Sequence, residues 1–206
     1  MPLTLYVGSK RRSSWSLRPY LALAYSGLAF EARTISLDRE TTKAEIKKVN
    51  PAGKLPVLHH DGLVIWDSLA ICEYAAELAP EAKLWPADRA QRARARSMCA
   101  EMHSGFAALR QHMSMDVVVD HPGEGRVPEA LADAARVMEL WRDALAASGG
   151  PFLFGSFTIA DAMFGPVTTR FTTYGVDLDA TCRRYVDAVA ALPAMQTWRR
   201  DAATEG

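Results

Sequence analysis

Two adjacent serines, Ser13 and Ser14, stand where the sequence predicts the junction between a strand and a helix. A serine hydroxyl can donate a hydrogen bond, and the first turn of a helix presents free backbone N–H groups at the positive end of its dipole. Together these groups can stabilise an anion. The simpler alternative is that either serine only caps the helix. The preceding Lys10, Arg11 and Arg12 either face an anionic ligand or form a solvated basic loop.

A second polar pair, Asp67 and Ser68, stands at another predicted helix start. The carboxylate suits an ammonium group, whereas the hydroxyl and the free amides of a first turn suit a carboxylate. An ordinary N-cap explains the same residues, and both roles can hold together.

The spacing of the cysteines and histidines and the balance of charges argue against a metal site and against strongly charged partners. Cys72, Cys99 and Cys182 form neither a CxxC pair nor a zinc spacing with histidine, so we expect no metal site and a reducing, cytoplasmic environment. Lys and Arg number 24, as do Asp and Glu, which argues against nucleic acid and anionic membranes as partners. The N-terminus lacks the order of a secretory signal, and no apolar run is long enough to span a membrane.

The first 79 residues must position both polar pairs, and their pattern is βαβαββα. The predicted strands are residues 3–7, 30–37, 55–58 and 63–66. The predicted helices follow the serine pair as far as Gly27, cover residues 43–48 and begin again at Asp67. Between the last two strands, Asp61-Gly62 predicts a hairpin turn.

Residues 80–87 predict a linker, because prolines at 80 and 86 interrupt any regular pattern, and residues 88–206 then predict an all-helical domain. Residues 87 to about 112 indicate one long helix. The buried face of the next helix is predicted from the spacing of Leu131, Ala135, Met138, Trp141 and Leu145. Thr158 and Asp161 form an S/T-x-x-D pattern typical of a helix-capping box, and Pro193 opens the last helix.

Four motifs in this order resemble the cytosolic glutathione transferase family. They are SSWSLR at residues 13–18, NPAGKLPV at 50–57, DSLAI at 67–71 and GSFTIAD at 155–161. The first is similar to the serine-type motif of the zeta class. The resemblance implies a thioredoxin-like α/β domain at residues 1–79 joined to an all-helical domain at residues 88–206.

The resemblance also implies that glutathione is the cofactor or co-substrate and that Ser13, or else Ser14, is the catalytic partner of its thiolate. Leu55 would pair through its backbone with the cysteinyl part of glutathione, next to a cis bond before Pro56. The glutathione-binding residues implied in this way are Trp15, Arg18, Lys54, Leu55, Pro56, Asp67 and Ser68. Arg18 could equally be a structural residue buried between the domains.

The helical domain of such proteins forms the second-substrate pocket. Candidates for it are His103, Phe106, Arg110, Arg170 and Tyr174, although a core stripe explains the apolar members equally well. The expected partners are a small electrophile and a second copy of the chain in a homodimer.

The function implied first is a glutathione transferase of the detoxification type, which adds the thiolate to a small electrophile. Maleylacetoacetate isomerase and glutathione-dependent peroxidase are enzymatic alternatives, and a non-catalytic glutathione-binding or stress protein is an alternative of another class. Isomerase specificity is less favoured, because Trp15 replaces the cysteine usual in the zeta motif and Pro19 follows Arg18. Thr173 also stands where relatives carry an arginine.

Overall fold

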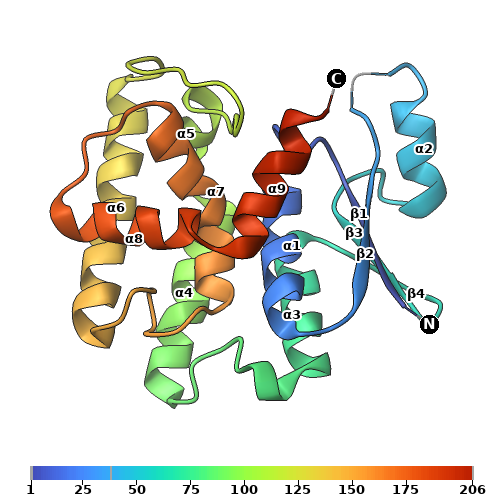
Figure 1. Ribbon diagram of the computed structural model, residues 1–206, viewed down its shortest axis with the longest axis horizontal. Helices are drawn as coiled ribbons and strands as arrows, with labels where there is room; N and C mark the ends of the chain where they lie inside the picture. The colour runs from blue at the N-terminus through green and yellow to red at the C-terminus, as the bar shows by residue number, and fades with distance from the viewer. Residues whose placement is uncertain (1, 38, 206) are drawn as a thin grey trace.

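The computed structural model describes residues 2–37 and 39–205 and has an α/β half beside an all-helical half (Figure 1). The α/β half confirms the predicted βαβαββα order. Its elements are β1 (Leu3–Val7), α1 (Ser14–Ser26), β2 (Phe30–Thr34), α2 (Thr42–Val49), β3 (Val57–His60), β4 (Leu63–Trp66) and α3 (Ser68–Leu78).

The four strands form one mixed sheet in the order β2-β1-β3-β4. β1 is parallel to β2 and antiparallel to β3. Asp61 and Gly62 join β3 to β4 with φ values of 46° and 83°, as a tight hairpin turn requires, so the hairpin prediction is confirmed. The predicted extension of β2 to Leu37 is wrong, because its neighbour β1 ends at Val7 and leaves later residues no strand to pair with.

Helices α1 and α3 cover the face of the sheet that looks toward the helical half, and α2 lies on the other side (Figure 1). Leu3, Leu5 and Val7 of β1 are buried while the residues between them are half-buried, as alternation along a strand dictates. The apolar sides of α1 and α3 pack on each other. Both helices begin at the same edge of the α/β half, and their first turns carry Ser13–Ser14 and Asp67–Ser68.

The helical half begins after a short connection that includes one 3-10 turn, η1 (Pro80–Ala82). Its helices are α4 (Arg89–Ser104), α5 (Ala107–His112), α6 (Pro128–Ser148), α7 (Ile159–Thr173), α8 (Ala180–Ala190) and α9 (Pro193–Ala203). Every residue of α7 except Thr172 is buried. The predicted capping box is confirmed: the Thr158 N–H donates to Asp161 Oδ2 at 2.8 Å, and the two side chains also bond.

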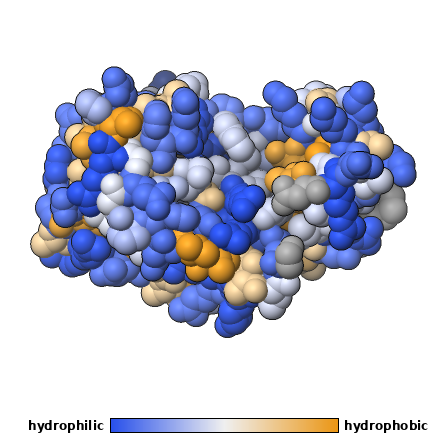
Figure 2. Space-filling model, turned by 90° about the horizontal axis from the view of Figure 1, so that it is seen from above, coloured by the Kyte–Doolittle hydropathy of each residue, from blue (hydrophilic) through white to orange (hydrophobic). Residues whose placement is uncertain are grey.

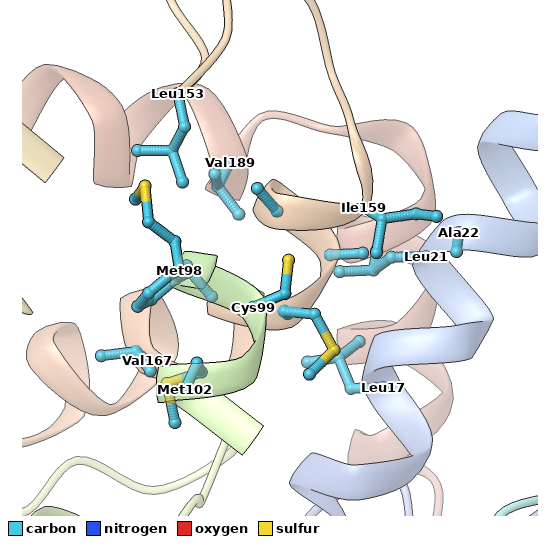
Figure 3. Close-up of a cluster of buried hydrophobic side chains, with 14 of the residues drawn as sticks. Leu17, Leu21, Ala22, Met98, Cys99, Met102, Leu153, Ile159, Val167 and Val189 are labelled. Carbon is cyan, nitrogen blue, oxygen red and sulfur yellow. The ribbon is translucent and has the colours of Figure 1, made fainter. Parts of the chain in front are cut away.

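The two halves share one apolar core. α1 packs against α7, and Gly165 permits this approach because a Cβ there would lie only 2.7 Å from the Leu21 Cδ1 atom. Figure 3 shows side chains of α1, α4 and α7 meeting in this core, among them Leu17, Leu21, Met98, Cys99, Met102, Ile159 and Val167. The helical half therefore holds α1, and with it the serine pair, in a fixed position.

The single long helix predicted over residues 87–112 is wrong. α4 ends at Ser104, and Gly105 and Phe106 turn the chain before α5 begins at Ala107. A Cβ on Gly105 would lie 2.7 Å from the Glu101 carbonyl oxygen, so only glycine allows this exit. Phe106 has a φ of 55° and is buried, so the turn places an aromatic ring in the core.

The predicted buried face of α6 is correct only in its second half. Trp141 and Leu145 are buried, whereas Leu131 and Ala135 are exposed. Alanines on several sides of α6 weaken the apolar stripe, and the side that packs is instead marked by Ala130, Ala134 and Val137.

Candidate active site

A cavity of about 600 Å³ lies in the α/β half where α1, α3 and the segment before β3 meet. Eight residues predicted from the sequence line it: Ser13, Ser14, Trp15, Lys54, Leu55, Pro56, Asp67 and Ser68. Arg12 and Trp66 are further lining residues. The structure thus brings residues from three separate motifs around one space large enough for a small molecule.

Ser13 is the N-cap of α1 and forms part of a serine network. Its Oγ lies 2.8 Å from Ser16 Oγ and 3.4 Å from the Ser16 N–H. Ser16 Oγ also accepts the N–H of Gly8 at 3.0 Å. Capping and a ligand-facing position therefore coincide in Ser13. Ser16, which is fully buried, was missed in the sequence because its role depends on contact with Gly8 across the loop.

The Leu55–Pro56 bond is cis, which confirms the prediction. The turn before it is held by Asn50, whose Nδ2 donates to the Lys54 carbonyl at 2.7 Å and whose Oδ1 accepts the Ala52 N–H at 3.0 Å. β3 begins two residues after Leu55, so Leu55 lies on the cavity wall just before the sheet.

Asp67 caps α3: its Oδ1 accepts the N–H groups of Leu69 at 2.8 Å and Ala70 at 3.3 Å. The backbone of Asp67 has a φ of 77°. Ser68 beside it is 1% exposed, and its Oγ has no hydrogen-bond partner within the described residues. A buried hydroxyl without a partner is costly, so Ser68 is suited to bind a ligand atom.

Three residues of the helical and α/β halves meet around Trp15. The guanidinium carbon of Arg18 lies 4.3 Å from the Trp15 ring centre, and that of Arg110 lies 5.3 Å from it. His103 packs edge-on against the same ring at 5.2 Å, and its Nε2 reaches Asp67 Oδ2 at 3.1 Å. His103 and Arg110 thus contact residues that line the cavity, but they do not line it themselves.

Arg18 is fully buried, and none of its guanidinium nitrogens has a hydrogen-bond partner in the described part of the chain. Burial, together with the charge of Arg110, lowers the pKa of Arg18 to about 10. Arg18 therefore lies between the domains, while its stacking on Trp15 keeps it next to the cavity wall.

The remaining second-substrate candidates are buried in the helical half, outside the cavity. Arg170 donates from Nε to the Met113 carbonyl at 2.8 Å, and burial lowers its pKa to about 9. Tyr174 stacks on His121, and Phe106 lies in the turn after α4. The structure does not bring these three residues together with the serine pair.

The basic run beside the serines is not a solvated loop, so that alternative is wrong for two of its members. Lys10 pairs with Asp201, and Arg11 forms a bidentate pair with Asp116 at 2.7–3.0 Å. Arg12 instead lines the cavity. Two of the three charges are therefore used to join the loop to the helical half.

The thiols of the protein itself lie in the core. Cys72, Cys99 and Cys182 are buried, and burial raises the pKa of each. A buried thiol of raised pKa remains protonated and is a poor nucleophile. A reactive thiolate in the cavity would therefore have to come from a ligand.

Within residues 2–37 and 39–205, no cluster of three or more His, Cys, Asp or Glu side chains is arranged to hold a metal ion. No helix among the described residues is both long and apolar enough to cross a bilayer. Figure 2 shows mostly hydrophilic residues on the face seen from above, with apolar residues in small separate patches.

Two known proteins match nearly the whole chain, and a third matches part of it. A solved structure of a glutathione transferase homolog from Burkholderia, with bound glutathione, superposes with a TM-score of 0.76 and 27% identity over 100% of both chains. A protein of Caenorhabditis elegans named "Probable maleylacetoacetate isomerase" is 31% identical over 89% of this chain and 87% of its own length. "Glutathione S-transferase 1" of Dianthus caryophyllus is 41% identical over 44% of this chain and 41% of its own.

Two family profiles match the two halves separately. The profile described as "Glutathione S-transferase, N-terminal domain" matches residues 12–78, which contain the serine pair, the cis proline and Asp67–Ser68. The profile described as "Glutathione S-transferase, C-terminal domain" matches residues 124–201. With a relative of 31% identity over most of both chains, these matches show that the protein belongs to the glutathione S-transferase family.

Proposed function

We propose that the cavity binds glutathione and activates its thiol for addition to a small electrophile, in a serine-type, zeta-like enzyme. The observation that carries this proposal is the set of groups around one cavity. A helix start with Ser13, the segment before β3 with Leu55 and a second helix start with Ser68 each suit a different part of glutathione.

Ser68 would bind the α-carboxylate of the γ-glutamyl end. Its buried hydroxyl needs a partner, and the first turn of α3 adds the positive end of a helix dipole. Asp67 Oδ1 is occupied by the cap, but Oδ2 is shared only with His103 among the contacts that the structure gives this atom. That oxygen would accept the ammonium group of glutathione.

Leu55 would hold the middle of the tripeptide. Its backbone lies on the cavity wall before the start of β3, where an extended ligand can pair with it as a short added strand. Asn50 fixes the turn that presents this backbone. The sulfur of a ligand held at both Leu55 and Ser68 would then be directed toward the remaining wall, which Ser13 and Ser14 form.

Ser13 would donate a hydrogen bond to the thiolate. A free thiol with a pKa of about 8.5 is roughly 3% ionised at pH 7, and lowering the pKa by about two units needs about 2.7 kcal/mol of preferential stabilisation. A hydrogen bond to an anion supplies about 1.5–3 kcal/mol, and the α1 dipole adds about 0.3–1 kcal/mol. These two sources are sufficient.

Ser16 would complete this arrangement. A hydroxyl can donate only one proton, so Ser13 must release its bond to Ser16 before it bonds to sulfur. Ser16 can then turn its own proton toward Ser13 Oγ while it still accepts from Gly8. The Ser16 hydroxyl would thus keep Ser13 oriented in both states.

Isomerisation is the second candidate activity, and similarity over 89% of the chain to a protein named as a maleylacetoacetate isomerase favours it. Trp15 and Thr173 favour simple addition, because both depart from the residues expected of an isomerase. Assays of both reactions decide between them.

Titration calorimetry with glutathione tests the binding step. We expect saturable binding by the parent and at least tenfold weaker binding by Ser68→Ala, which loses a hydrogen bond to a charged group. Ser97→Ala is the matched control, because Ser97 is exposed on α4 and donates to the Ala93 carbonyl of its own helix. Absence of binding by the parent contradicts the proposed function.

A further inference from the structure

The loop between β1 and α1, residues 8–13, carries Ser13 and is held by Glu205 from the other end of the chain. Glu205 Oε2 accepts the Ser9 hydroxyl at 2.8 Å, and Oε1 accepts the Lys10 N–H at 2.8 Å. The Arg11 N–H also points to Oε2, at 3.4 Å. One carboxylate therefore accepts hydrogen bonds from three successive residues, about 195 positions away in the sequence.

Helix α9 reinforces the same contact. The buried Trp198 donates from Nε1 to the Lys10 carbonyl at 2.7 Å, and Lys10 Nζ pairs with Asp201. Figure 1 shows α9 beside α1, with the C-terminal end reaching the edge of the α/β half where this loop lies. Lys10 is thus bound through its N–H, its carbonyl and its ammonium group.

Ser9 connects this contact to the serine pair. The Ser9 carbonyl accepts the N–H of Ser13 at 2.7 Å and that of Arg12 at 3.2 Å, while the Ser9 hydroxyl donates to Glu205. A displacement of Ser9 therefore also displaces the N-cap of α1. The path from Glu205 to Ser13 passes through only one residue.

We propose that Glu205 is a positioning residue for Ser13, an inference that rests on the proposed function of the cavity. Its two oxygens fix Ser9 and Lys10, and these fix the direction in which the Ser13 hydroxyl meets the glutathione sulfur. Glu205 does not line the cavity that holds Ser13 and Ser68. Its loss should therefore change thiol ionisation much more than glutathione affinity.

The substitution Glu205→Gln tests this role without a change in side-chain size. The amide replaces one acceptor oxygen by a donor, so either Lys10 or Arg11 loses its acceptor. We expect the pKa of bound glutathione to rise by about half a unit, which lowers the thiolate fraction about threefold at pH values below that pKa. kcat should fall with it, while KM for glutathione should change less than twofold.

Hydrogen–deuterium exchange supplies a readout without glutathione. In Glu205→Gln, exchange at whichever of the Lys10 and Arg11 amides loses its acceptor should accelerate about fivefold or more, as the loss of one hydrogen bond to a carboxylate predicts. Ser9→Ala removes the other partner and should shift the thiol pKa in the same direction. Glu77→Gln, an exposed substitution on α3, is the control and should change neither quantity.

Two failures are distinguishable in this design. If the parent binds no glutathione, the proposed function is wrong, whatever the exchange rates show. If the parent binds glutathione but its bound thiol has the same pKa in Glu205→Gln, the positioning role of Glu205 is wrong, even where an exchange rate rises.

Discussion

Asp161 allows the energetics of the helical half to be tested quantitatively. It is fully buried and accepts three hydrogen bonds, from the N–H groups of Leu153 at 3.0 Å and Thr158 at 2.8 Å and from the Thr158 hydroxyl at 3.1 Å. Burial raises the pKa of Asp161 to about 6, although these hydrogen bonds oppose the rise. The hydrogen bonds of the Asp161 side chain thus stabilise the folded state, whereas the burial of its charge destabilises it.

The substitution Asp161→Ala removes both contributions. The lost hydrogen bonds dominate at pH 7.5, because the buried N–H groups of Leu153 and Thr158 are then left without their acceptor, at about 1–3 kcal/mol each. We therefore expect a net loss of about 3 kcal/mol in the free energy of unfolding at pH 7.5. For a chain of this size, this lowers Tm by roughly 10 °C.

The pH dependence of this loss has a defined sign. Because the folded pKa of Asp161 is raised, its proton-linked stabilisation is complete below about pH 4 and disappears as the pH rises through 6. The stability difference between parent and Asp161→Ala should therefore be about 1.4 kcal/mol larger at pH 5 than at pH 7.5.

Urea unfolding at the two pH values measures this difference. Asp143→Ala is the matched control, because Asp143 is exposed on α6 and forms a surface ion pair with Arg94 at 3.5 Å. For this control we expect the free energy of unfolding to change by less than about 0.5 kcal/mol. A Tm of Asp161→Ala equal to that of the parent would refute the argument, as would a difference that grows with pH.

Three further predictions concern other parts of the fold. Burial alone would raise the pKa of Asp116, but hydrogen bonds from Arg11 and from the backbone of Val118 and Val119 hold this pKa well below its usual range. The substitution Asp116→Asn should therefore lower the free energy of unfolding in urea by about 2 kcal/mol at pH 7. This loss should shrink below about pH 4, where the carboxylate of the unfolded parent becomes protonated. A loss that stays constant into acid would contradict this pairing. Gly105→Ala should cost about 1–3 kcal/mol, since its Cβ meets the Glu101 carbonyl oxygen, and an unchanged urea midpoint would show that the turn tolerates a side chain. Light scattering at micromolar concentration should give the mass of a homodimer; a monomer mass would refute that expectation.

Local signals in the sequence predicted those features that depend on neighbouring residues. The Asp61–Gly62 turn and the Thr158–Asp161 capping box are each specified by the backbone needs of a few adjacent positions. The Ser13 and Ser68 positions were found in the same way, because both lie at helix starts.

Features that depend on distant residues were missed or wrong. Gly105 suggested no break, because a single glycine is tolerated in many helices and the position of the turn depends on the core that receives Phe106. The charges of Lys10 and Arg11 predicted a solvated loop, since their partners Asp201 and Asp116 lie far away along the chain. Periodicity alone cannot show which carboxylate meets a given cation.

The ultraviolet absorbance of the thiolate tests the central claim most directly. Bound glutathione is titrated with pH in the parent and in Ser13→Ala, Ser14→Ala and the control Ser97→Ala. We predict a thiol pKa about two units below that of free glutathione in the parent and in the control, and a rise of about one unit or more in Ser13→Ala, from the loss of one hydrogen bond to the anion. Bound glutathione with the pKa of the free thiol, or a depressed pKa that survives both Ser13→Ala and Ser14→Ala, would contradict activation by this serine pair.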